Sequence, residues 1–229
     1  MVIFPIIAAA VSAVFATLLL LRYAHSHGLP HLFWGISMAM FAVASLVVAA
    51  GVGGGWDPTL FRVYWLFGAM LTVPFLALGS VALLRNRVLT ALMALVVAVG
   101  TIFAFGVVLA AHANTAAFQL DAKQVPRGSA VWGKHTLLHN LADWYSIPAF
   151  LVVVGVAIYS SRPKVAARMP KSRVRGNWLV AGGVTLVAIG SSTARYGHGA
   201  VFSIFLALGA AVMFAGFVMA SRQPHEVET

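Results

Sequence analysis

Two histidines and an aspartate follow one another at intervals of four residues in the second half of the chain. They are His135, His139 and Asp143. On a helix, residues four apart lie one turn above each other, about 6 Å apart, so these three side chains would share one face. Two imidazoles at this spacing can bind the same metal ion, and a carboxylate can join them. The pattern therefore predicts a candidate site for zinc or copper at a helix surface.

A site of this kind needs more ligands than one helix supplies, because zinc in proteins usually has four. His112, His198 and Asp57 lie near the ends of predicted helices and are candidates for the remaining positions. Two other interpretations stay open. In the first, the face that carries His135, His139 and Asp143 stabilises a helix end, where the helix dipole favours Asp143. In the second, the two histidines sense pH. The sequence has no HExxH motif, so Asp143 itself would have to activate water or act as a ligand.

Composition places these residues in a membrane protein. Of the 229 residues, 61% are hydrophobic and only 9% are charged, and the mean hydropathy is +0.94. A soluble domain carries about a quarter charged residues, so a water-soluble enzyme is excluded. The net charge of +10 is explained by Lys and Arg close to lipid headgroups. We therefore expect membrane lipids, and no nucleic acid, as partners.

Seven runs without a charged residue are long enough to cross, or nearly cross, about 30 Å of hydrocarbon as helices. They predict one all-α, polytopic membrane domain over residues 1–221, a seven-transmembrane-helix bundle, followed by a short polar cytoplasmic tail at 222–229. A long outer loop at 112–143 separates the fourth and fifth runs. The predicted helices cover residues 2–21, 32–53, 63–84, 88–111, 144–161, 178–194 and 200–220.

The Lys and Arg residues predict the orientation, because loops on the cytoplasmic side carry an excess of them. With the N-terminus outside, ten of the 15 fall on the inner side and five on the outer side. The fifth loop, residues 162–175, holds six of the ten. We therefore expect a multi-pass protein of the cell membrane, with its N-terminus outside and its C-terminus in the cytoplasm.

Several kinds of chemistry are disfavoured by residues that the predicted helices lack. A covalent retinal pigment needs a lysine inside a helix. The four lysines instead fall in predicted loops, at Lys123, Lys134, Lys164 and Lys171. Ion-coupled transporters usually keep ionisable residues within the membrane, and the seven runs contain none. The absence of cysteine excludes disulfides, thiolate metal sites and cysteine nucleophiles.

Local features predict how the helices bend and pack. Pro74 lies inside the third run and lacks a backbone N–H, so it should kink that helix. Gly and Ala are dense in the sixth and seventh runs, which should therefore pack closely against each other. We also expect residues 135–143 to be helical and continuous with the fifth run. The apolar stripe of this segment, which would face the bundle, consists of Leu137, Leu138, Leu141 and Ala142.

Four segments resemble recurring elements of a family of uncharacterised bacterial seven-helix membrane proteins. They are Phe61–Leu71, Ala157–Arg162, Ser192–Gly197 and Ala211–Phe217. The resemblance runs over most of residues 32 to 221 and implies a fold and a topology, with no established activity to carry over. The segment Gly133–Ala142 is similar to a His-led helix in other bacterial membrane families without an assigned function.

Three classes of function follow from these patterns. We expect a non-catalytic integral membrane protein, either an accessory subunit that joins other membrane subunits or a lipid-binding bundle, because no catalytic motif is present. The first alternative is a metal-dependent membrane hydrolase that acts at the outer face. Its ligands would come from His135, His139, Asp143, His112 and His198. The second alternative is a transporter built as three helices, a linking helix and three more.

Overall fold

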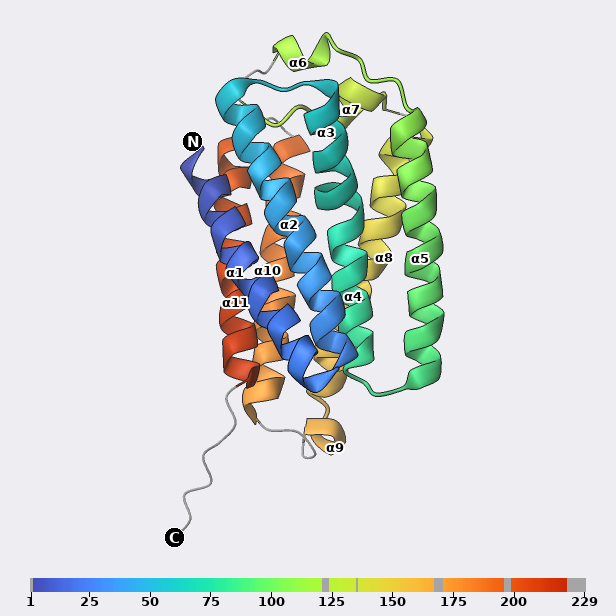
Figure 1. The fold of residues 1–229 in the computed structure, drawn as a ribbon, viewed down its shortest axis with the longest axis vertical. Helices are drawn as coiled ribbons and strands as arrows, with labels where there is room; N and C mark the ends of the chain where they lie inside the picture. The colour runs from blue at the N-terminus through green and yellow to red at the C-terminus, as the bar shows by residue number, and fades with distance from the viewer. Residues whose placement is uncertain (1, 121–123, 135, 167–170, 196–198, 222–229) are drawn as a thin grey trace.

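Long stretches of Ala, Leu and Val form the helices of an elongated bundle (Figure 1). The computed structural model describes residues 2–120, 124–134, 136–166, 171–195 and 199–221, and these residues contain no β-strand. The third long helix is built from α3 (Pro58–Tyr64), a π-helical segment η1 (Trp65–Leu71) and α4 (Thr72–Ala82). The other long helices are α1 (Ile3–Ser26), α2 (Leu29–Gly54), α5 (Arg87–Ala110), α8 (Leu137–Ser160), α10 (Lys171–Arg195) and α11 (Gly199–Ser221). Short helices at the two ends are α6 (Ala117–Leu120), α7 (Gly128–Trp132) and α9 (Pro163–Ala166).

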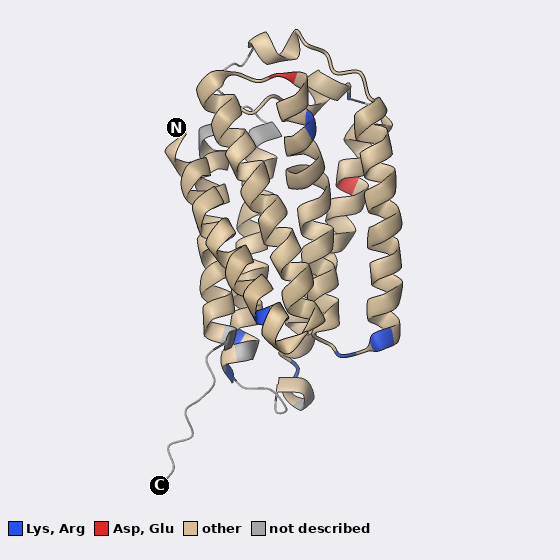
Figure 2. Cartoon of the chain, viewed as in Figure 1, with Lys and Arg blue, Asp and Glu red and all other residues tan. Residues whose placement is uncertain are grey.

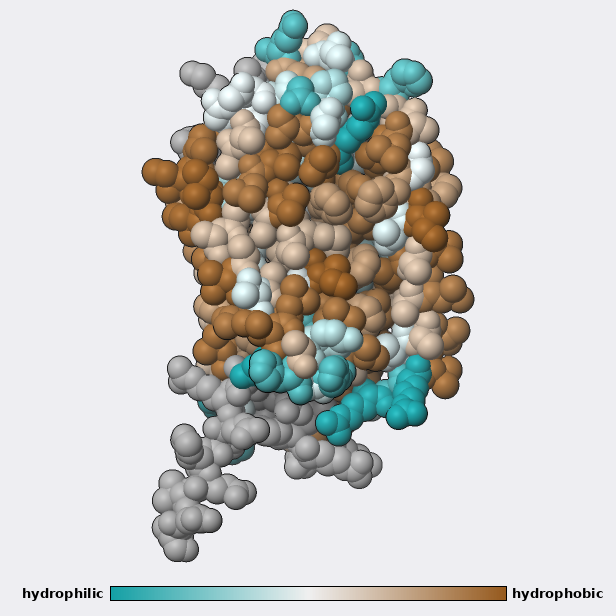
Figure 3. All heavy atoms as spheres, viewed as in Figure 1, coloured by the Kyte–Doolittle hydropathy of each residue, from teal (hydrophilic) through white to brown (hydrophobic). Residues whose placement is uncertain are grey.

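Six helical stretches of the described chain are long and apolar enough to cross a membrane. Large hydrophobic side chains are exposed around the bundle, most of all on α5, where Ile102 is 75% exposed and Leu109 69%. Figure 3 shows them as an apolar belt between two more polar ends. Apolar surface of this extent belongs in lipid, so the chain is a multi-pass membrane protein. The prediction of an all-α membrane fold is confirmed. The six stretches are α1, α2, α3 to α4 taken together, α5, α8 and most of α11.

Several helices extend beyond the charge-free runs in the sequence. α1 continues to Ser26, α8 begins at Leu137, and α10 begins at Lys171. Lys171 therefore lies at a helix end and not in a loop as predicted. A charge-free run marks only the hydrocarbon part of a helix, because the backbone hydrogen bonds continue into the headgroup region where charges are tolerated. α10 is as long as its neighbours, but its first turns are charged and it is not among the six apolar stretches.

The long helices other than α5 form a ring, and α5 lies outside this ring. α1 packs between α2 and α11, α2 packs against α4, α4 against α8, α8 against α10, and α10 against α11. α5 contacts α4 and α8 and leaves most of its surface exposed. Side chains hold α2 to α4, since Trp34 Nε1 donates to the Leu76 carbonyl (3.1 Å) and Ser37 Oγ to the Thr72 carbonyl (2.7 Å). The ring leaves an interior that side chains from several helices must fill.

Glycine allows α10 and α11 to pack with their backbones in close contact, as predicted. A Cβ atom at Gly183 would lie 2.7 Å from the carbonyl oxygen of Gly209, and one at Gly209 would lie 2.8 Å from the carbonyl oxygen of Gly183. Both distances are shorter than van der Waals contact, so neither position accepts a side chain. The pair fixes how closely these two helices approach.

A π-helical segment, η1, ends three residues before Pro74, where the sequence predicts a kink. In a π-helix the N–H of residue i+5 donates to the carbonyl of residue i. For the Ala69 carbonyl that donor would be Pro74, which has no N–H. The Ser146 hydroxyl of α8 donates to this same carbonyl at 2.6 Å. A polar contact from the π-helical segment to α8 is thus made within three residues of its end.

Lys and Arg gather at the end of the bundle that holds α9, here called the basic end (Figure 2). Arg22 near the end of α1 lies with its guanidinium 5.2 Å from the centre of the Phe217 ring on α11. Arg85 lies in the turn from α4 to α5, and Arg87 begins α5. The opposite end, which holds α6 and α7, is called the loop end. α1 begins at the loop end and α11 ends at the basic end (Figure 1).

Candidate functional site

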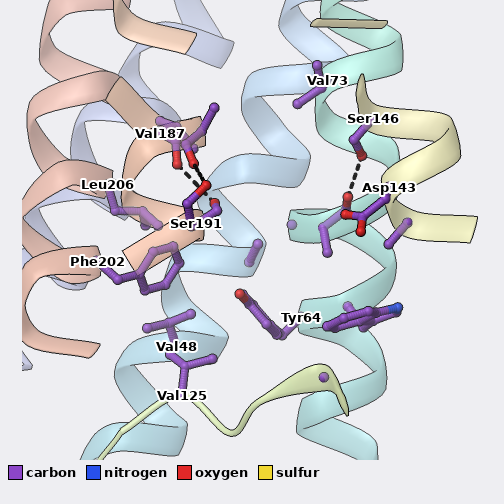
Figure 4. Close-up of a pocket in the computed structure, with 18 of the residues that line it drawn as sticks. Val48, Tyr64, Val73, Val125, Asp143, Ser146, Val187, Ser191, Phe202 and Leu206 are labelled. Carbon is purple, nitrogen blue, oxygen red and sulfur yellow. Dashed lines mark hydrogen bonds between the residues drawn. The ribbon is translucent and has the colours of Figure 1, made fainter. Parts of the chain in front are cut away.

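A cavity of about 370 Å³ lies inside the bundle near the loop end. Its walls come from α2, α3, η1, α4, α8, α10 and α11, and residues 125–129 cover it toward the loop end. The volume is within the range of ligand pockets, roughly 300 to 1,000 Å³. Figure 4 shows side chains from these elements around one open space: Val48, Tyr64, Val73, Val125, Asp143, Ser146, Val187, Ser191, Phe202 and Leu206.

The lining is mostly apolar and carries polar groups from several sides. Asp143 and Ser146 come from α8, Ser191 from α10 and Ser45 from α2. Arg127, which is exposed, lies in the segment that covers the cavity. A mainly apolar cavity with a few converging polar groups is the usual form of a small-molecule binding site. The cavity is therefore the candidate functional site.

The hydroxyl groups in this lining mainly offer hydrogen-bond acceptors. Ser146 donates its proton to the Ala69 carbonyl, and Ser191 donates to the Val187 carbonyl at 2.9 Å. A serine whose proton is already donated presents lone pairs to a ligand. Ser45 is fully buried, and its Oγ has no hydrogen-bond partner. A buried hydroxyl without a partner costs free energy, so a polar ligand group beside Ser45 would remove that cost.

His139 also lines the cavity and stacks on an aromatic neighbour. Its ring lies 6.1 Å from the Trp65 ring, at an interplanar angle of 26°. The Nδ1 atom of His139 is buried and has no hydrogen-bond partner. The first turn of α8 holds the residue in place, because the Thr136 hydroxyl accepts a hydrogen bond from the His139 backbone N–H at 3.4 Å. The imidazole therefore faces the site with one nitrogen available.

Aromatic rings form a cluster beside the cavity near the loop end. Phe61 is fully buried and lies with its ring centre 5.6 to 5.9 Å from the centres of five neighbouring rings. These neighbours are Trp56, Tyr64, Trp65, Phe118 and Trp132. Rings at these distances and tilts attract one another beyond the area they bury. The cluster ties α3 and η1 to α6 and α7, and two of its members, Tyr64 and Trp65, line the cavity.

The structure brings two of the five predicted metal ligands together. His139 and Asp143 lie one turn apart on α8 and both line the cavity. His112 is exposed just beyond the end of α5. His135 and His198 lie outside the described residues. In the part of the chain that the structure describes, no group of three or more His, Cys, Asp or Glu side chains is placed to hold a metal ion.

Asp57 and Arg62, two other residues near the loop end, have structural partners. Asp57 begins α3, and its Oδ1 accepts hydrogen bonds from the backbone N–H groups of Thr59 (2.7 Å) and Leu60 (3.0 Å). Arg62 donates through Nη2 to the Ala111 carbonyl at 2.8 Å, which ties α3 to the end of α5. Carboxylates are favoured at helix N-termini because the free N–H groups there need acceptors. The geometry thus gives Asp57 the role of a helix cap.

The helices that contain the charge-free runs also carry ionisable residues outside those runs. Asp143 and His139 belong to the apolar stretch Leu137–Ser160, and Arg62 belongs to Pro58–Ala82. The runs in the sequence were defined by the absence of charge, so the third run begins directly after Arg62 and the fifth directly after Asp143. The prediction that residues 135–143 continue the fifth run as a helix is confirmed from Leu137 onward, and Leu138 and Ala142 are buried as expected. It is wrong for Thr136, which is the N-cap and not helical, and for Leu137, which is exposed and does not face the bundle.

Comparison of the chain with protein-family models, with curated proteins and with solved structures finds no match. Function must therefore be inferred from the geometry of the cavity and from the distribution of charge.

Proposed function

We propose that the chain is a seven-span protein of the cell membrane, with its N-terminus outside and its C-terminus in the cytoplasm. The positive-inside rule supports this orientation, because the basic end carries most of the described Lys and Arg side chains. α10 is the proposed seventh span. It packs along α11 through Gly183, and residues 178–194 carry no charge. The cavity then lies in the outer half of the membrane.

We infer that the protein is a non-catalytic binder of a small amphiphile, which occupies this cavity. The single observation that carries the inference is the cavity itself, apolar over most of its lining and polar at Asp143, Ser146 and Ser191. An amphiphile matches such a lining because its chain is buried against Val and Phe while its head finds hydrogen-bond partners. An accessory role beside other membrane subunits is compatible with this activity.

Ligand binding tests this proposal directly. The purified full chain in phosphatidylcholine nanodiscs should bind a fluorescent long-chain amphiphile saturably, with a stoichiometry of about one per chain, because one cavity of this size takes one ligand of drug size. Equilibrium fluorescence titration gives both the affinity and the stoichiometry. Uptake that only follows the lipid content, as for empty nanodiscs, would contradict a binding site.

The orientation is tested by labelling single cysteines, since the native chain has none. Gly54 is exposed at the loop end of α2, and Arg87 is exposed at the basic end of α5. In intact cells, a membrane-impermeant maleimide should label Gly54→Cys, and it should label Arg87→Cys only after permeabilisation. The reverse pattern, or labelling of both from outside, would contradict the proposed topology.

A metal-dependent hydrolase is the second candidate. It is favoured by one observation: His139 and Asp143 line the same cavity, and Nδ1 of His139 is buried without a partner. This candidate predicts about one zinc per chain, lost in His139→Ala, because removing one of few ligands greatly weakens binding. Elemental analysis of the purified chain and of the variant measures this. Zinc content that does not change in His139→Ala would contradict a role for this histidine.

A further inference from the structure

The contact between α8 and α10 differs between the two ends of the bundle. Near the basic end, hydrogen bonds join the helices: Asn177 Nδ2 donates to Ser160 Oγ at 3.2 Å, and Trp178 Nε1 donates to Ser161 Oγ. Toward the loop end, residues of both helices line the cavity instead. The two helices are thus held together at one end and are separated by the cavity at the other.

The cavity reaches the surface of the bundle along this separation. Ile147 of α8 is 55% exposed and also lines the cavity. Ala188 and Ser191 of α10 are likewise exposed and line it from the opposite side. Residues that border both the cavity and the outside mark an opening. Between two helices that span a membrane, such an opening faces lipid.

The polar lining favours a particular head group. Its charged members are one carboxylate, Asp143, and one guanidinium, Arg127, so their formal charges cancel. The cavity therefore offers no excess of opposite charge to a ligand that carries a net charge. Ser146 and Ser191 have already donated their protons, so they present acceptor oxygens from α8 and from α10. A hydroxyl fits this set best, because it is uncharged, can donate to these oxygens and can accept from the unpartnered Ser45 hydroxyl.

We propose that the cavity takes up a neutral, single-chain lipid alcohol from the outer leaflet, through the opening between α8 and α10. The hydroxyl donates to Asp143 or Ser146, and the chain passes Ile147 and Ala188 toward the lipid. A volume of about 370 Å³ suits one chain with a small head and not a two-chain phospholipid. This inference rests on the proposed function and orientation, and it adds the class of ligand and its route.

Competition between probes tests the head group. The full chain in phosphatidylcholine nanodiscs is loaded with a fluorescent long-chain alcohol, which is then displaced by hexadecanol, hexadecylamine or hexadecanoic acid. Hexadecanol should displace it at about tenfold lower concentration than the amine or the acid. The hydroxyl makes one good hydrogen bond, whereas the amine and the acid would each bring an unpaired charge into the cavity. In Asp143→Leu this preference should disappear.

Two outcomes of the competition separate the inference from the proposed function. Equal displacement by all three probes in the native chain would overturn the head-group assignment, while binding itself would still stand. Failure of every probe to bind in the cavity would overturn the proposed function as well.

Cross-linking tests the route. In the double variant Ile147→Cys/Ala188→Cys, a flexible bis-maleimide should slow uptake of the fluorescent alcohol from phosphatidylcholine vesicles by about tenfold, which corresponds to a barrier higher by ~1.4 kcal/mol. The equilibrium affinity should change little. The matched control, Ser160→Cys/Asn177→Cys, cross-links the same helices where they already meet, and its uptake rate should equal that of the native chain. An unchanged uptake rate in the first variant would overturn the proposed route.

Discussion

Replacing Ala142 with tryptophan should abolish binding of the amphiphile while the bundle stays folded. Ala142 is buried on α8 and lines the cavity one turn below Leu138. An indole at this position would occupy space that the ligand needs, and affinity should fall at least about tenfold. Equilibrium titration with the fluorescent alcohol measures the loss, and a thermal unfolding curve in detergent verifies the fold.

The matched control for this prediction is Ala98→Trp. Ala98 is an exposed position on α5, outside the ring of helices, so the same substitution there faces lipid. It should leave the affinity unchanged. Equal affinity in Ala142→Trp and in the native chain, with both folded, would show that the ligand binds elsewhere.

The largest effect on stability is expected for Gly183→Val. The new side chain would meet the Gly209 carbonyl at 2.7 Å and the Met213 backbone nitrogen at 2.9 Å, and backbone atoms cannot move aside as a side chain can. Separating α10 from α11 should cost ~3 kcal/mol or more, at the upper end of what overpacking usually costs. Thermal unfolding in detergent should show a large fall in the midpoint temperature.

The neighbouring glycine provides the control for this substitution. A Cβ atom at Gly182 would meet no side chain and no neighbouring helix within 4 Å, so Gly182→Val should change the free energy of unfolding by only about 0.5 kcal/mol or less. A similar loss of stability in both variants would mean that helix propensity, and not the close approach of α10 and α11, determines the effect.

Much of the architecture could be predicted from the sequence because helix surfaces that face lipid must be apolar. Charge-free runs located the helices, and the dense Gly and Ala of residues 178–194 and 200–220 correctly indicated close packing. The helical continuity of Leu137 to Asp143 followed from side chains that recur at helical spacing. Each of these features is local, or concerns two helices that are adjacent in the sequence.

The cavity could not be predicted in this way because its lining is spread over many helices. Ser45, Ser146 and Ser191 are separate serines in apolar segments, and nothing in the sequence places them around one space. The contact from Ser146 to the Ala69 carbonyl is made inside a π-helical segment, whereas the sequence predicted only a kink at Pro74. Defining spans by the absence of charge also began the fifth predicted helix at residue 144, and so left Asp143, which lines the cavity, in a loop.

Photo-crosslinking tests most directly whether the cavity is a binding site. Hexadecanol carrying a diazirine is equilibrated with the full chain in phosphatidylcholine nanodiscs and irradiated, and the labelled residues are identified by peptide mass spectrometry. Labels should concentrate at residues 139–150 of α8 and 184–192 of α10, and excess hexadecanol should suppress them. Labels spread along the exposed face of α5, and insensitive to excess hexadecanol, would contradict binding in the cavity.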